Sequence, residues 1–168
     1  MSTTSRRLIG LISRRSAVAM ALALASIVIG SANAASAASS LTLRVTSPPH
    51  FSAAIGGCPA GHVADTVTAV DGGTLGELDG CFQTFVFFGD GSDSFTATYT
   101  FDVPGGRIVT SIAGHETPTP TGVVMAVTGT IVGGTGLYGG SSGAISGGGP
   151  VDFTSGIQPN LVFVLSFS

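Results

Sequence analysis

The chain has 168 residues, of which 43% are hydrophobic and 9% are charged, and glycine occurs 26 times. This hydrophobic fraction excludes a disordered chain, because disordered chains contain too few apolar residues to form a core. Beyond an arginine-rich N-terminal segment, two arginines and no lysine stand against nine acidic residues, a net charge near −7. Such a charge excludes nucleic acids and acidic membrane surfaces as partners, since both attract clustered lysine and arginine.

Residues 1–37 have the pattern of a secretory signal peptide. Met1–Arg15 carries four arginines and no acid, Ser16–Gly30 is an apolar run, and two A-x-A cleavage signals follow at 32–34 and 35–37. The apolar run is shorter than the roughly 20 residues of a membrane-spanning helix. The pattern therefore favours cleavage over an uncleaved N-terminal anchor, and we expect no stable membrane insertion afterwards.

The export route is left open by the sequence. The stretch around Arg14 and Arg15 resembles a twin-arginine signal, but ordinary export signals also contain paired arginines. In either case we expect a secreted or extracytoplasmic protein. Its mature part, residues 38–168, has the size of one domain with its own hydrophobic core.

Eight segments rich in valine, isoleucine, threonine and phenylalanine alternate with glycine and proline clusters, which predicts eight β-strands. In chain order they are 41–46, 62–70, 81–88, 93–102, 107–114, 123–132, 136–146 and 160–168. In Ser94–Asp102 apolar residues alternate strictly with polar ones. Alternation places Phe95, Tyr99 and Phe101 on one face. These three are our candidates for lining a ligand cavity, and simple filling of the interior is the alternative.

The segment 81–88 differs because it is apolar on both faces. That pattern is typical of a strand covered on its outer side by a partner subunit or by loops. Eight short strands joined by tight turns predict an all-β fold, an eight-stranded antiparallel β-barrel that leaves no exposed sheet edge. A two-sheet β-sandwich is the alternative.

Cys58 and Cys81 are the two cysteines of the chain. Export would place them in an oxidising compartment, so we expect a disulfide bond between them. Closing a loop of this length stabilises a fold by about 3 kcal/mol in the chain-entropy model. Zinc is the rival interpretation, since His62 is close in sequence, but a fourth ligand is not evident. We therefore expect no metal and no cofactor.

The stretch Gly134–Gly139 matches G-x-G-x-x-G, the dinucleotide-binding fingerprint. That motif should open a helix and precede an acid on the next strand, whereas here Gly140–Gly143 is a poor helix start. The glycines instead predict a hairpin that turns at Val132–Gly136, where positive φ is required. The later glycines would let the returning strand bend or approach a neighbour closely.

The same hairpin carries a resemblance. The stretch GTIVGGTGLYGGSSGAIS (Gly129–Ser146) resembles the hairpin of the allene oxide cyclase barrel family and the related plant dirigent proteins. The shared features are the pair Ile131–Val132, the G-G-T-G at Gly133–Gly136, the aromatic Tyr138 and spaced glycines after it. The preceding stretch FDVPGGRIVTSIAG also resembles family members. The cysteine pair and export signal are similar to those of bacterial secreted members.

The resemblance implies an eight-stranded antiparallel barrel with an apolar cavity, often trimeric in plant members. Those plant relatives guide cyclisation or coupling of reactive lipid or phenolic intermediates, and bacterial relatives include cyclases that fold polyketide-like chains. The family's catalytic groups lie outside the matching hairpin, so no catalytic residue carries over. The activity to expect of an enzyme of this kind is isomerase-like or cyclase-like.

Asp65 is the candidate catalytic residue that the sequence offers. It lies mid-strand between Val63 and Val67. An inward orientation would bury its carboxyl group, raise its pKa and make it a general-acid candidate. An outward, solvated orientation is the favoured interpretation.

The remaining polar residues are few. His50, His62 and His115 are interpreted as surface residues, and Glu116 as a rim residue without an identifiable partner. Asp102 and Arg107 flank a turn, which predicts an ion pair across the hairpin. No Ser-His-Asp arrangement and no metal-ligand cluster stands out in the sequence.

Two functions from different classes follow. The first is an exported barrel that binds a small apolar ligand and steers its cyclisation. The second is a non-catalytic structural or cell-surface module with a filled barrel. A cavity of a few hundred Å³ containing a carboxylate such as Asp65 would favour the first, and a solidly packed interior the second. Assembly into a homo-oligomer is left open.

Overall fold

The structure, a computed structural model, describes residues 40–52, 57–69 and 73–168. The expected signal peptide lies outside these residues. The described part consists of strands and one short 3₁₀ helix, η1. Their bounds are β1 (Ser40–Val45), β2 (His50–Ser52), β3 (Gly61–Ala69), β4 (Thr74–Phe87), β5 (Asp93–Val103), β6 (Gly106–Thr119), β7 (Gly122–Gly134), η1 (Gly136–Tyr138), β8 (Gly143–Asp152), β9 (Gln158–Pro159) and β10 (Leu161–Phe167).

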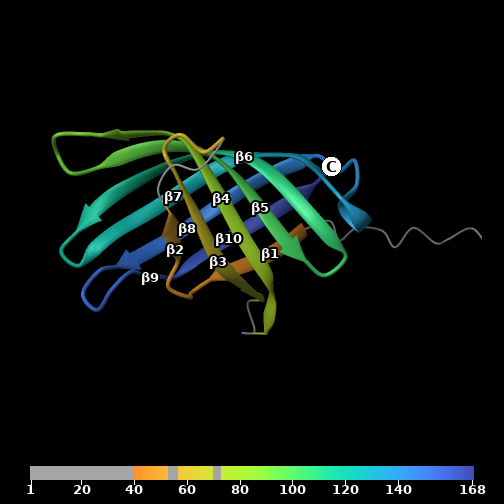
Figure 1. Cartoon of the computed structure of the whole chain (residues 1–168), viewed down its shortest axis with the longest axis horizontal. Coiled ribbons are helices and arrows are strands. Elements are labelled where there is room, and N and C mark those ends of the chain that lie inside the picture. The colour runs from red at the N-terminus through yellow and green to blue at the C-terminus, as the bar shows by residue number, and fades with distance from the viewer. Residues whose placement is uncertain (1–39, 53–56, 70–72) are drawn as a thin grey trace, which may run out of the picture. The chain divides into compact units, whose positions relative to one another are not determined.

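Eight of these strands close into an antiparallel barrel (Figure 1). From β3 to β8 each strand pairs with the next along the chain, β8 pairs with β10, and β10 pairs with β1. β1 then closes the ring on β3 through three residue pairs, from Leu43↔Ala69 to Val45↔Val67. The short β2 pairs with the N-terminal part of β3, whereas β1 pairs with its C-terminal part. The short β9 pairs with β8. The predicted barrel is therefore confirmed, and the sandwich is wrong.

One half of the barrel interior is filled. The side chains with almost no solvent exposure include Leu43, Phe101, Ile108, Phe163 and Leu165, which come from four strands. The rings of Phe101 and Phe163 meet edge to face with their centroids 5.9 Å apart, a favoured geometry for aromatic pairs. This cluster is the main core of the protein.

Several predicted strand ends were wrong, and β4 begins at Thr74 rather than at Cys81. β6 continues past Gly114 through a proline-rich stretch to Thr119, because its last residues extend past β5 and pair only with β7. Pro118, which cannot donate a backbone hydrogen bond, is tolerated where a strand has one neighbour. β8 begins at Gly143 rather than Gly136, since η1 and a turn connect β7 to β8.

The glycines of β8 were expected to end the strand but lie inside it. Gly148 has φ of +136°, a backbone conformation that favours glycine. A Cβ atom there would meet the carbonyl oxygen of Met125 on β7. Glycine at this position therefore permits close approach of β7 and β8. Of the three glycines for which the sequence predicted such a role, Gly143 has it, because a Cβ atom there would meet the carbonyl oxygen of Ser166 on β10, whereas Gly139 and Gly140 lie in the turn before β8.

A β-bulge in β4 explains why its sequence is apolar on both faces. The register with β5 shifts between Phe82 and Thr84. Phe82 and Phe85 would face opposite sides of a regular strand, but the extra residue turns both rings inward. Beyond the bulge the tip of the β4–β5 hairpin is exposed, with Phe87 at 78% and Phe88 at 47%. The described loops do not cover this tip, so a covering partner subunit stays a prediction.

Candidate functional site

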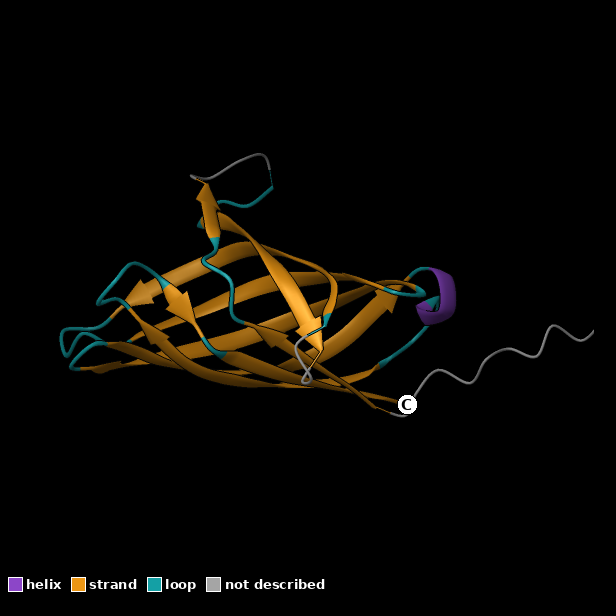
Figure 2. Ribbon diagram, turned by 90° about the horizontal axis from the view of Figure 1, so that it is seen from below, coloured by secondary structure: helices purple, strands orange, loops and turns teal. Residues whose placement is uncertain are grey.

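The other half of the barrel holds a cavity of about 530 Å³. Its lining residues Phe85, Glu116, Val123 and Phe153 place it at the end of the barrel where the β4–β5, β6–β7 and β8–β9 connections lie. The loops of this end are on the left of the ribbon in Figure 2. Most of its wall is apolar. The aromatic members are Phe51, Phe82, Phe85, Tyr99 and Phe153, and the aliphatic side chains around them include Val45, Val63, Leu78, Val123, Met125, Val151, Ile157 and Leu161.

The aromatic wall comes from β4 and β5. Phe82 meets Phe85 and Tyr99 edge to face, with ring centroids 5.8 and 6.2 Å apart. Phe95 stacks behind Phe85 at 5.6 Å. Gly114 makes room for Phe95, because a Cβ atom at that position would meet the Phe95 ring. The bulge in β4 and this glycine together give the cavity a continuous aromatic side.

The three predicted cavity residues all face inward and are buried, but they occupy different places. Tyr99 lines the cavity. Phe95 supports the cavity wall from behind through its contacts with Phe82 and Phe85. Phe101 belongs to the filled half and packs on Phe163. A direct role in ligand binding therefore stays a prediction, with the geometry favouring Tyr99.

Asp65 faces the interior, on the same side of β3 as Val63 and Val67, and only 9% of it is exposed. The favoured outward orientation was wrong. Its Oδ1 accepts hydrogen bonds from the Ser47 hydroxyl and, at 2.7 Å, from the Thr66 amide. Burial raises the pKa of Asp65, and these hydrogen bonds oppose that rise. Ser47 thus supplies the partner that a buried carboxylate needs.

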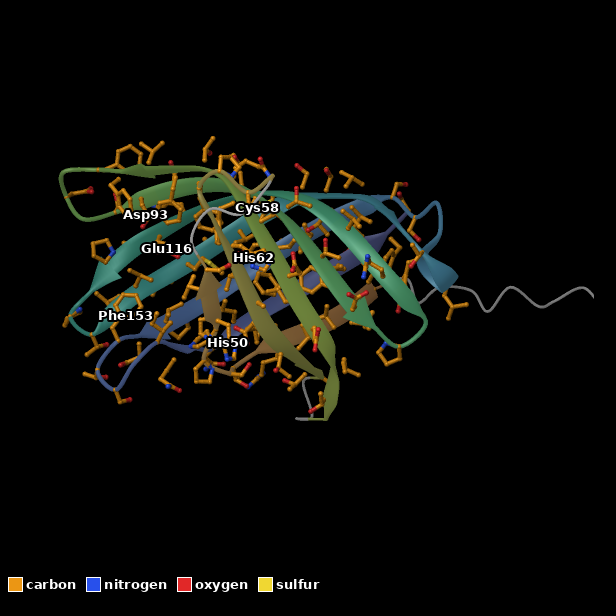
Figure 3. The ribbon with its side chains drawn as sticks, in the orientation of Figure 1. His50, Cys58, His62, Asp93, Glu116 and Phe153 are labelled. Carbon is orange, nitrogen blue, oxygen red and sulfur yellow. A yellow bond between two sulfur atoms is a disulfide. The ribbon has the colours of Figure 1, made fainter. Side chains whose placement is uncertain are left out.

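A second acidic site is formed by Asp93 and Glu116, which face each other across β5 and β6 (Figure 3). Glu116 lines the cavity. Burial, the negative charge of Asp93 and a hydrogen bond between the two carboxyl groups raise the pKa of Glu116 to about 7. Burial also raises the pKa of Asp93. Two carboxyl groups this close hold one proton between them more readily than two negative charges.

The surroundings of Asp93 agree with a proton shared between the two carboxyl groups. Asp93 is 5% exposed, and its Oδ1 has no hydrogen-bond donor among the described residues. A protonated Glu116 supplies a donor to this carboxylate. The pair can therefore give or take a proton close to neutral pH at the cavity wall, which is what general acid–base chemistry requires.

Tyr99 adds a hydroxyl group to the same space. It is 3% exposed, and among the described residues no hydrogen bond to its hydroxyl is found. Burial raises the pKa of Tyr99, and the charges of Glu116 and Asp65 raise it further. The hydroxyl therefore stays protonated at neutral pH and is free to hydrogen-bond a ligand.

A Ser-His-Asp row, which the sequence did not reveal, crosses β2, β3 and β4. The Ser52 hydroxyl lies 3.3 Å from Nδ1 of His62, and Nε2 of His62 lies 2.6 Å from Asp79. Asp79 is 55% exposed, and Ser52 is exposed as well. Ser52 and His62 are among the residues that line the cavity, whereas Asp79 alternates with inward-facing neighbours on β4 and lies on the outer face. We interpret the row as a tie that holds β2 on the barrel.

Cys58 and Cys81 lie at disulfide distance, with their sulfur atoms 2.08 Å apart. This pair fixes the segment before β3, whose Pro59 and Ala60 line the cavity, to β4. The predicted ion pair is also confirmed, because Arg107 donates to both carboxylate oxygens of Asp102 at 2.8 and 3.0 Å. Among the described residues no cluster of three His, Cys, Asp or Glu side chains could hold a metal ion.

No described helix is long and apolar enough to cross a membrane. No protein-family model matches the chain, and no curated protein is similar to it in sequence. Among solved structures, a pyocyanin demethylase is similar with a TM-score of 0.49 and 20% identity, over 77% of this chain and 99% of that chain. Membership of the allene oxide cyclase or dirigent family stays a prediction, whereas the strand pairing itself establishes the barrel.

Proposed function

We propose that this protein binds a small, largely apolar molecule in the open half of its barrel. The observation that carries the proposal is the cavity of about 530 Å³ with apolar walls and the carboxyl groups of Asp65 and Glu116. Its volume falls in the range of small-molecule sites, which combine apolar walls with a few polar groups. The alternative of a structural module with a filled barrel is disfavoured because only half of the interior is filled.

The carboxyl groups extend the proposal to chemistry. A ligand held against Glu116 and Tyr99 would meet a group that exchanges a proton near pH 7 and a protonated hydroxyl. Fixing a reactive chain in one conformation beside an acid is sufficient to steer its cyclisation. The isomerase-like activity rests on this arrangement together with the resemblance of the β7–β8 hairpin.

We also propose that the mature protein works outside the cytoplasm. The cysteine pair at disulfide distance is compatible with an oxidising compartment. The arginine-rich, apolar N-terminal sequence supports the same proposal. Mass spectrometry of the protein recovered from the culture medium or periplasm of an expressing bacterium would show whether residues 1–37 have been removed.

Binding can be tested with Nile red, a neutral dye whose fluorescence rises in apolar surroundings. Val123 lines the cavity, and Val132 lies on the outer face of the same strand with 58% exposure. We expect Val123→Trp to fill the cavity mouth and weaken dye binding about tenfold or more, equal to the loss of about 1.4 kcal/mol. Val132→Trp adds the same ring outside and should leave binding unchanged. Equal titration curves for both variants, or no binding to the native protein, would contradict the proposal.

A further inference from the structure

The open half of the barrel gathers negative charge without a matching positive side chain. Asp65 and Glu116 line the cavity, and Asp93 stands beside Glu116. The chain has no lysine. Among the described residues, Arg107 is held by Asp102 on the outer face, and Arg44 is flanked on β1 by inward-facing residues and so points outward. No arginine of the described part therefore reaches the cavity.

Histidines neutralise little of this charge. His62 lies at the cavity wall, but its Nε2 is bonded to the exposed Asp79. His115 is exposed, and its charge is the smallest contribution to the pKa of Asp93. His50 lies on the far side of Asp65 and lowers its pKa only as a minor contribution. Buried carboxylates without a counter-ion are costly. A positively charged ligand would remove this cost, and the gain would appear as affinity.

The wall beside the carboxyl groups suits a cation as well. Phe82, Phe85 and Tyr99 form one aromatic side of the cavity. The faces of aromatic rings attract ammonium groups, most strongly where water is excluded. The Tyr99 hydroxyl and the Oδ2 atom of Asp65 have no hydrogen bond among the described residues. They are therefore available to a ligand with N–H donors.

The same features work against an anionic ligand. A carboxylate or phosphate would meet Asp65 and the Asp93–Glu116 pair in a space where water screens charge poorly. Unpaired like charges of this kind reject the wrong ligand more strongly than apolar contacts select the right one. Among ligands of equal shape, the cavity should therefore bind a cation more tightly than a neutral molecule, and a neutral molecule more tightly than an anion.

We propose that the ligand of this cavity is an amine with an aromatic or otherwise apolar body, its ammonium group held by the carboxyl groups of Asp65 and Glu116. This inference rests on the proposed function, since it names the chemical class of the molecule bound. The aromatic wall takes the body of the ligand, and the carboxyl groups take its charged end.

Three probes with one naphthalene body test the inference. Naphthylmethylamine is a cation, naphthylmethanol is neutral and naphthylacetate is an anion at neutral pH. Calorimetric titration of the native protein should show the amine binding about tenfold or more tightly than the alcohol, as expected of a charge-assisted hydrogen bond. Naphthylacetate should bind most weakly. This comparison needs no variant, so it does not depend on the folding of any.

Variants then assign the preference to residues. Glu116→Gln and Asp65→Asn keep the shape of each side chain and should bring the affinities for amine and alcohol within about threefold of each other, because the charge-assisted contact is lost. Asp102→Asn removes a carboxylate from the outer face and should leave the tenfold preference intact.

The outcomes separate the two proposals. If Nile red binds and the three naphthalene probes bind equally, the amine inference fails while the proposed function stands. A preference for naphthylacetate would overturn the inference in the same way. If neither the dye nor any naphthalene probe binds, the proposed function fails and the amine inference fails with it.

Discussion

The two halves of this barrel are built from the same strands, but one half is a packed core and the other holds the cavity. In the filled half the inward residues are large and apolar, and Phe101, Phe163 and Leu165 have no exposed surface. In the open half the inward residues of the same strands include Asp93 on β5 and Glu116 on β6. The half that is packed solid stabilises the fold, which lets the other half keep a cavity and buried carboxyl groups that cost stability.

The contrast between the halves indicates where the functional groups of such a barrel lie. Carboxyl groups in a dry interior destabilise the folded state unless they are paired, and proteins retain such groups mainly at functional sites. Here Asp65 has Ser47 and Asp93 has Glu116, and both arrangements lie at the open end. Three measurements test this division between the filled and the open half.

The largest effect is expected from truncating the filled half. Phe163 is fully buried, and its ring contacts those of Tyr99 and Phe101 at 6.0 and 5.9 Å. Phe163→Ala should lower the free energy of unfolding by about 3–5 kcal/mol, because it leaves a void that neighbours cannot close. Phe85→Ala, at the half-buried cavity wall, should cost about 1 kcal/mol but weaken Nile red binding.

Urea denaturation measures the loss of stability in the two variants, and titration with Nile red measures their loss of dye binding. The division between halves is wrong if Phe85→Ala proves as destabilising as Phe163→Ala. It is equally wrong if Phe163→Ala abolishes dye binding while the variant remains folded.

The cysteine pair should have the next largest effect. Cys58 and Cys81 are 23 residues apart, and replacing both by serine should lower the free energy of unfolding by about 3 kcal/mol, since the unfolded chain regains its loop entropy. Dye binding should weaken as well, because the segment before β3 lines the cavity. Denaturation of the oxidised protein and of the double variant measures the difference. Coincident transitions would show that the open half does not depend on this tie.

Much of the fold follows from the sequence because strand alternation is a local signal. The strict pattern of Ser94–Asp102 placed Tyr99 and its neighbours inward, as found. Alternation also put Asp65 on the face of Val63 and Val67. The outward orientation was preferred because buried carboxylates are rare. That general rule was outweighed by Ser47, which comes from a different part of the chain and could not be inferred from the local pattern.

The pairing of Asp93 with Glu116 was within reach of the sequence. The predicted ion pair of Asp102 with Arg107 fixes the register of the β5–β6 hairpin, and the same register places Asp93 opposite Glu116. Ending β6 at Gly114 hid this pair. The last residues of β6 form a strand because they pair with β7 beyond the end of β5. This pairing between strands cannot be inferred from the local proline-rich sequence.

The bulge in β4 was missed because Cys81–Phe88 was interpreted as a regular strand with two apolar faces. The consecutive polar residues Gln83 and Thr84 between Phe82 and Phe85 coincide with the change of phase, but two polar residues in a row are also compatible with a turn. The bulge exists because the inward positions at Phe82 and Phe85 can be filled only with an extra residue between them. The aromatic wall of the cavity therefore emerged only from the structure.

The smallest expected effect is the pH dependence of stability that the buried carboxyl groups of the open half cause. The pKa of Glu116 rises from its ordinary value of 4.5 to about 7 in the folded protein, and that of Asp93 rises as well. The folded state therefore holds protons more tightly than the unfolded chain. Stability from this source is greatest below about pH 4.5 and falls as the pH rises to about 7. Besides burial, Asp93 and Glu116 act on each other, and the charge of His115 lowers the pKa of Asp93.

Denaturation midpoints between pH 4 and pH 8 measure this slope, which should be modest because water reaches part of Glu116. Glu116→Gln should flatten the decline, since the neutral amide cannot ionise. Asp102 has the opposite pH dependence. The hydrogen bond from Arg107 lowers its pKa, so the stability that Asp102 contributes is lost as the pH falls. Asp102→Asn should therefore leave the decline in stability toward pH 7 in place. If Glu116→Gln keeps the full slope, the Asp93–Glu116 pair does not hold its proton in the folded protein, and the slope comes from other groups such as Asp65, whose pKa burial also raises.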